Sequence, residues 1–195
     1  MPHVTTEALQ RTLERCSEGH PVKAELTAWA LYISPDMHGR DNDLSQLLQS
    51  ALPHLSPGEQ GALRAAAIAN QRLTRFILDR LEPEASQSLV EGLLFAAPVG
   101  DAAGGHMLHP VAQSTIVEAL QLPAYQVESG RRLLAYEIYP RIISGGYSPE
   151  ATSGLELERL RYIAALPGRT DFARIERVFR DRLLRGEIWR ADEVA

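Results

Sequence analysis

Two histidines three residues apart, His106 and His109, are the candidates for metal chemistry in this sequence. Imidazole nitrogens bind zinc and similar divalent ions, and Asp101 lies close enough along the chain to add a carboxylate. A complete site needs a further ligand that the sequence does not specify. The alternative is structural: His106 bonds to backbone in a turn and His109 caps a helix that follows Pro110. We therefore predict no cofactor and keep a divalent metal at His106 and His109 as the one candidate site.

The single cysteine, Cys16, is the candidate nucleophile, because Glu18 and His20 follow it closely. The segment around Cys16 reads as the end of a helix, where the helix dipole disfavours a thiolate. The chain also lacks a Gly-x-Ser-x-Gly elbow, a Walker A motif and a Gly-x-Gly-x-x-Gly motif. The sequence thus offers no complete catalytic constellation, and the balance of these observations leans away from an enzyme.

The charge of the chain is unevenly distributed. The net charge is −5, yet residues 156–190 hold nine Arg against six Asp and Glu, so this segment is +3 and the remainder is −8. Arginine recognises carboxylates and phosphates in a bidentate manner, and exposed aromatic residues often anchor interfaces. We therefore predict a partner-binding surface for a protein with an acidic patch, made of Arg174, Arg177, Arg182, Arg185, Trp189 and Tyr147. The alternative is an ordinary solvated helix face, with in-helix pairs such as Glu176–Arg180.

The elements that would position these residues are helices. Ser56-Pro57-Gly58-Glu59 has the pattern of a capping box, and Asp43-x-x-Gln46 has the same pattern. Apolar positions after Glu59 recur at helical spacing. The pattern predicts a long central helix over residues 57–81. Further helices are predicted over residues 6–17, 22–33, 43–51, 83–97, 111–120, 124–143, 155–166 and 171–185. The predicted fold is all-α, a compact bundle of eight to nine helices around the helix 57–81.

The domain organisation follows from length. A chain of 195 residues fits one domain, so residues 1–195 are predicted to form a single helical domain. The segment 98–110 combines glycines, prolines and histidines and is predicted to be a hinge or a functional loop.

These observations favour a non-enzymatic cytosolic interaction module of bacterial type: an adaptor, regulator, inhibitor or immunity-type protein. A lone cysteine and the absence of a long apolar run predict a cytoplasmic protein with no membrane partner. One alternative is a helical enzyme or a metal- or cofactor-binding protein that uses the histidines of 98–110. A second is a nucleic-acid-binding regulator that uses the C-terminal arginines, which the net acidity disfavours. Association of two copies of the chain into a homodimer is a further alternative.

Overall fold

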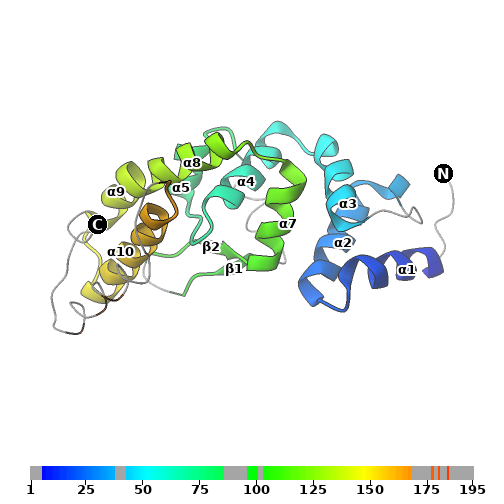
Figure 1. The fold of residues 1–195 in the computed structure, drawn as a ribbon, viewed down its shortest axis with the longest axis horizontal. Coiled ribbons are helices and arrows are strands. Elements are labelled where there is room, and N and C mark those ends of the chain that lie inside the picture. Colours follow the sequence, from blue (N-terminus) through cyan, green and yellow to red (C-terminus); the bar gives the residue numbers. More distant parts are fainter. Residues whose placement is uncertain are drawn as a thin grey trace. The chain divides into compact units, whose positions relative to one another are not determined.

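The computed structural model describes residues 6–37, 43–85, 96–100 and 103–167, together with Arg177, Arg180 and Leu184. The chain divides into two compact units. Figure 1 labels the helices and strands from which they are built. The first unit comprises Met1–Pro98 and His106–Leu122, and the second comprises Val99–Gly105 and Pro123–Ala195. The structure is mostly helical, which confirms the predicted all-α class. The assignment of residues 1–195 to a single domain stays a prediction, as does a hinge at 98–110.

The first unit is built mainly from helices. Its elements are α1 (Thr6–Ser17), α2 (Pro21–Ile33), the 3-10 turn η1 (Pro35–Met37), α3 (Leu44–Ala51), the 3-10 turn η2 (Leu52–His54), α4 (Pro57–Ile68), α5 (Arg75–Leu81), β1 (Ala96–Pro98), β2 (His106–Leu108) and α7 (Pro110–Leu120). Helix α2 packs against α1, α3 and α7, and α4 packs against α5 and α7. The core of this unit therefore forms where these helices meet.

Both predicted capping boxes are confirmed. The Ser56 hydroxyl accepts a hydrogen bond from the backbone N–H of Glu59, and the Glu59 carboxylate accepts one from the backbone N–H of Ser56 at 2.8 Å. Asp43 and Gln46 make the same exchange at the start of α3. These caps satisfy N–H groups that have no partner inside the helix, which explains why the local sequence alone located both helix starts.

The prediction of one long helix over residues 57–81 is wrong. Helix α4 ends at Ile68, and α5 begins at Arg75 after a non-helical link. In that link, the backbone N–H and C=O of Leu73 pair with the C=O and N–H of His106 at 2.7 and 2.9 Å. The Thr74 hydroxyl then accepts from the N–H of Ile77 and caps α5. A backbone pairing to a distant segment and a new cap together outcompete helix propagation.

Helix α4 nevertheless occupies a core position. Nearly all of its later residues are buried, and five of them are alanine or glycine: Gly61, Ala62, Leu63, Ala65, Ala66, Ala67 and Ile68. Small side chains let neighbouring helices approach closely. The side chain of Gln113 on α7 donates to the carbonyl of Ala67 at 3.1 Å, which satisfies a backbone acceptor at the end of α4.

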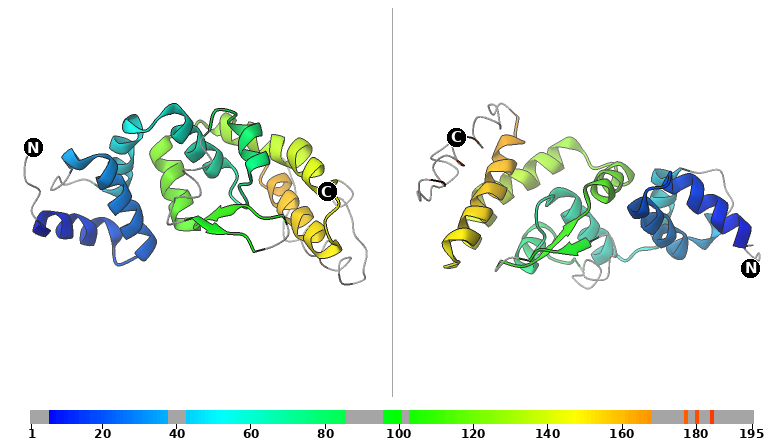
Figure 2. Two further views of the ribbon diagram at one scale, coloured as in Figure 1. Left: turned by 180° about the vertical axis from the view of Figure 1, so that it is seen from behind. Right: turned by 90° about the horizontal axis from the view of Figure 1, so that it is seen from below.

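A short hairpin replaces part of the predicted loop and part of a predicted helix. Strands β1 and β2 pair antiparallel, with Ala96 opposite Leu108 and Pro98 opposite His106 (Figure 2). The helix predicted over residues 83–97 is therefore wrong at its described ends, since Pro83 and Glu84 form a turn and Ala96 and Ala97 lie in a strand. The pairing joins segments on either side of a glycine-rich connection, which helical periodicity does not reveal.

The second unit contains α8 (Ala124–Leu133), the π-helical segment η3 (Leu134–Ile138), α9 (Tyr139–Ile143) and α10 (Pro149–Ala164). The predicted helix 124–143 thus holds, but it is wound as a π-helix just before Pro140. Proline lacks an N–H and its ring clashes with the preceding turn, and a wider turn relieves that conflict. Helix α10 starts earlier than residue 155 because Ser148 caps it and Pro149 occupies its first turn.

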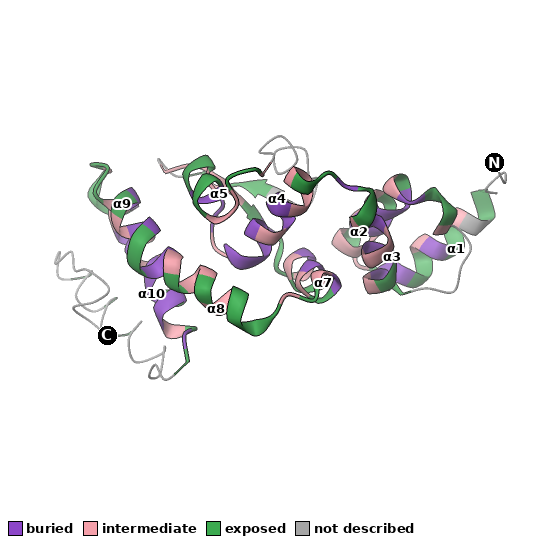
Figure 3. Cartoon of the chain, turned by 90° about the horizontal axis from the view of Figure 1, so that it is seen from above, coloured by how far each residue is buried: buried purple, intermediate pink, exposed green. Residues whose placement is uncertain are grey.

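Burial differs sharply between the helices of the second unit. Helix α10 places eight residues in the core, whereas α8 has no buried residue (Figure 3). Within the described ranges of the chain, we find no helix whose length and apolar character would let it cross a membrane.

Candidate functional site

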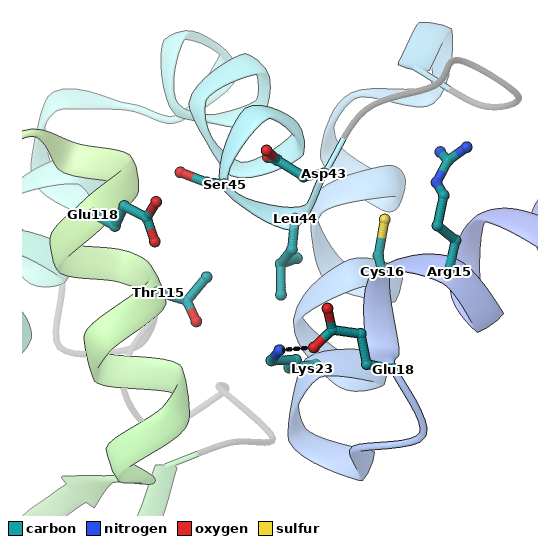
Figure 4. Close-up of a pocket in the computed structure, with 9 residues that line it drawn as sticks. All are labelled: Arg15, Cys16, Glu18, Lys23, Asp43, Leu44, Ser45, Thr115 and Glu118. Carbon is teal, nitrogen blue, oxygen red and sulfur yellow. Dashed lines mark hydrogen bonds and ion pairs between the residues drawn. The ribbon is translucent and has the colours of Figure 1, made fainter.

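A polar cavity of about 430 Å³ lies among α1, α2, α3 and α7 of the first unit. Figure 4 shows Thr115 and Glu118 of α7 pointing toward the side chains of the other three helices. The lining residues are Arg15, Cys16, Glu18, Lys23, Asp43, Leu44, Ser45, Thr115 and Glu118. The cavity therefore joins the thiol to acidic, basic and hydroxyl groups.

Most of these polar groups already make structural contacts. Glu18 forms an ion pair with Lys23, and the hydrogen bond from Lys23 lowers the pKa of Glu18. Asp43 accepts from the backbone N–H of Gln46 at 2.8 Å, and Thr115 donates to the carbonyl of Val111 at 2.8 Å. The polar groups around the cavity thus stabilise the surrounding helices, through a helix cap, a hydrogen bond to backbone and an ion pair.

The surroundings of Cys16 disfavour its thiolate. Cys16 is 6% exposed. Burial raises the pKa of this thiol above its ordinary value, and the hydrogen bond with Arg15 opposes that rise only in part. Asp43 and Glu18 raise the pKa further through their negative charges. Because the thiolate is the nucleophile, this environment does not activate Cys16 for covalent catalysis.

The structure brings His109 to His20 and not to a metal-binding cluster. The two rings meet edge to face, with centroids 5.6 Å apart and an angle of 67° between their planes. His109 caps α7 because its Nδ1 accepts from the N–H of Val111 at 3.2 Å. His20 caps α2 in the same way, through the N–H of Val22 at 3.2 Å.

This capping bears directly on the candidate metal site. A neutral imidazole has one acceptor nitrogen, so an accepting Nδ1 leaves the proton on Nε2 and no lone pair for a metal. His106 is half-buried in β2, where its backbone pairs with Leu73. Among the described residues, no group of three or more His, Cys, Asp or Glu side chains is arranged to hold a metal ion. The structure thus uses His109 as a helix cap, whereas Asp101 lies outside the described residues, so metal binding by His106 and His109 stays a prediction.

The predicted partner-binding residues fall largely outside the described part of the chain. Arg174, Arg182, Arg185 and Trp189 lie beyond it. Arg177 is helical and exposed, and Tyr147 is half-buried in the link between α9 and α10. A Cβ on Gly145 would lie 2.9 Å from the carbonyl oxygen of Ile142 and 3.3 Å from the Tyr147 ring, so the backbone contact favours glycine at this position. Whether these residues form one surface stays a prediction.

Helix α2 exposes an aromatic surface that the sequence analysis did not single out. Its core side carries Leu26, Thr27, Ala30 and Leu31, all buried. Its other side carries the exposed Ala28, the half-buried Trp29 and Tyr32, which is 85% exposed. We call Ala28, Trp29 and Tyr32 the α2 aromatic face. The sequence of α2 is apolar over most of its length and so indicates this face. A helix with one buried side needs apolar residues on that side only, so the others must lie on its exposed side.

His20 also escaped the sequence analysis as a partner of His109. A repeated tripeptide could have indicated this pairing, because His20-Pro21-Val22 and His109-Pro110-Val111 are identical in sequence. Each tripeptide places a histidine at the cap and a proline at the first helical position.

Comparison with known proteins identifies no relative of this chain. No family model matches the chain, and neither the curated proteins nor the solved structures contain a significant match.

Proposed function

We propose that this protein is a non-enzymatic helical interaction module that binds another protein through the α2 aromatic face. The observation that carries the proposal is Tyr32, a large aromatic side chain left 85% exposed on a helix whose opposite side is fully packed. Tyrosine and tryptophan dominate the binding energy of many protein interfaces. Tyr32 and Trp29 are one helical turn apart, so one partner surface would cover both.

The state of the cavity supports a binding role over catalysis. Its thiol is buried and has a raised pKa, and two of its three carboxylates, Asp43 and Glu18, cap a helix or pair with a lysine. We further propose that the module is cytoplasmic and of bacterial type, in keeping with a single, buried cysteine. Arg174, Arg177, Arg182, Arg185, Trp189 and Tyr147 stay the proposed second contact, for an acidic patch of the same partner.

Affinity capture with matched variants tests the proposal. The tagged wild-type chain, the Tyr32→Ser variant and the Tyr125→Ser variant are used as baits in cells that naturally produce the protein. Tyr125 is the control because it is also a tyrosine, is 69% exposed and belongs to the second unit. We expect Tyr32→Ser to reduce the recovered partner by about tenfold or more, since an interface hot spot contributes about 2 kcal/mol. Equal recovery by all three baits contradicts a role for α2, and turnover of a small molecule by the purified protein contradicts a non-enzymatic role.

A further inference from the structure

The first unit contains two helix caps of the same unusual kind in contact with each other. His20 caps α2 and His109 caps α7, each with Nδ1 accepting a backbone N–H at 3.2 Å. Their rings are 5.6 Å apart, and α2 packs against α7. Asparagine, aspartate, serine and threonine are the usual caps and accept a hydrogen bond at neutral and mildly acidic pH. Histidine accepts one only while its ring is neutral.

We propose that His20 and His109 form an acid-sensitive latch, which holds α2 to α7 while both rings are neutral and loosens when they are protonated. The proposal does not depend on the proposed function. Imidazole is the side chain that ordinarily gains a charge between pH 8 and pH 5.

Three effects of protonation act in the same direction. A charged imidazole has a proton on both nitrogens, so Nδ1 no longer accepts and meets the helix N–H as a second donor. A positive charge at a helix N-terminus opposes the helix dipole. Two charged rings at 5.6 Å also repel each other. Protonation therefore weakens both caps and the contact between them.

The nearby charges offer these rings little compensation. The first turns of α2 and α7 contain no acidic residue. Glu18, in the turn before α2, is engaged by Lys23. Of the other charged groups on these helices, Arg15 of α1, Asp43 at the start of α3 and Glu118 of α7 line the cavity, and His106 is the ionisable group of β2. The remaining charged residues do not line it: Glu25 of α2, and Glu7, Arg11 and Glu14 of α1. Asp43 already serves as a cap, which leaves Glu118 as the carboxylate on α7 itself.

The test compares unfolding at two pH values in variants whose caps cannot be protonated. Asparagine replaces histidine, because it caps a helix with an uncharged acceptor. The full-length chain with Trp189→Phe is unfolded in urea at pH 7.5 and pH 5.5, so that fluorescence reports Trp29 on α2. The variants in this background are His20→Asn, His109→Asn and the double variant. The control is His54→Asn, because His54 is exposed in η2 of the same unit.

We expect the urea midpoint of the parent chain to fall between pH 7.5 and pH 5.5. The double variant should lose less than half as much, the single variants should lie between, and His54→Asn should behave as the parent. An equal fall in the parent and the double variant overturns the latch, as does an equal effect of His54→Asn. If the double variant is unfolded at pH 7.5, the single variants decide in the same way: a fall equal to that of the parent in both overturns the proposal.

Discussion

The guanidinium of Arg159 donates from Nε to the carbonyl oxygen of Ala135 over 2.7 Å. Ala135 belongs to the π-helical segment η3, where the usual pattern of backbone hydrogen bonds changes. Arg159 is 5% exposed, and its Nη1 lies 3.4 Å from the carboxylate of Glu156, which is 2% exposed. A buried ion pair on α10 thus supplies a donor to the irregular backbone that precedes Pro140, and this links the packing of the second unit to the winding of its helix.

Replacement of Arg159 by methionine should destabilise the second unit by about 3 to 5 kcal/mol, because it leaves the carboxylate of Glu156 buried without its cation. Urea unfolding followed by circular dichroism measures the change. The matched control is Arg161→Met on the exposed side of α10, which we expect to alter stability by no more than about 0.5 kcal/mol. The double variant Glu156→Leu with Arg159→Met should recover most of the loss, since it removes both charges. An Arg159→Met variant as stable as wild type would contradict this role.

Acidification should weaken the capping box of α4. Hydrogen bonds from the Ser56 side chain and backbone lower the pKa of Glu59 below its ordinary value. The stabilising contribution of Glu59 is therefore fully present above the pKa of an unfolded glutamate and is lost as the pH falls through the lower pKa of the folded state. Unfolding midpoints between pH 6 and pH 3 should show a smaller acid loss in Glu59→Gln than in wild type. An equal fall of the unfolding midpoint between pH 6 and pH 3 in the two proteins would contradict this explanation.

Cys16 should react slowly with a thiol reagent in the native protein. Burial raises the pKa of the thiol and also shields it from the reagent. Since the chain has one cysteine, a colorimetric disulfide reagent reads this residue alone. We expect the native rate at pH 8 to be at least about tenfold below the rate in denaturant. Reaction at the denatured rate would show instead that the cavity exposes the sulfur.

The sequence predicted those features that depend on residues close together in the chain. Asp43 with Gln46 and Ser56 with Glu59 are three residues apart, so their capping boxes could be recognised directly. The end of α4 was missed because it depends on a backbone pairing between Leu73 and the distant His106. The contact between His20 and His109 was missed for the same reason, although the cap at His109 had been weighed as an alternative. The π-helix depends on how η3 packs on α10, because Pro140 alone predicts only that the helix kinks or ends.

Site-specific photo-crosslinking at Tyr32 tests the central claim most directly. A benzophenone amino acid replaces Tyr32 in one chain and the exposed Tyr125 in another, and both are irradiated in cells that naturally produce the protein. A binding surface on α2 predicts a discrete crosslinked species of higher mass from position 32 and a much lower yield from position 125. Equal yields at the two positions, or no crosslinked species at position 32, would contradict the assignment of α2 as the binding surface.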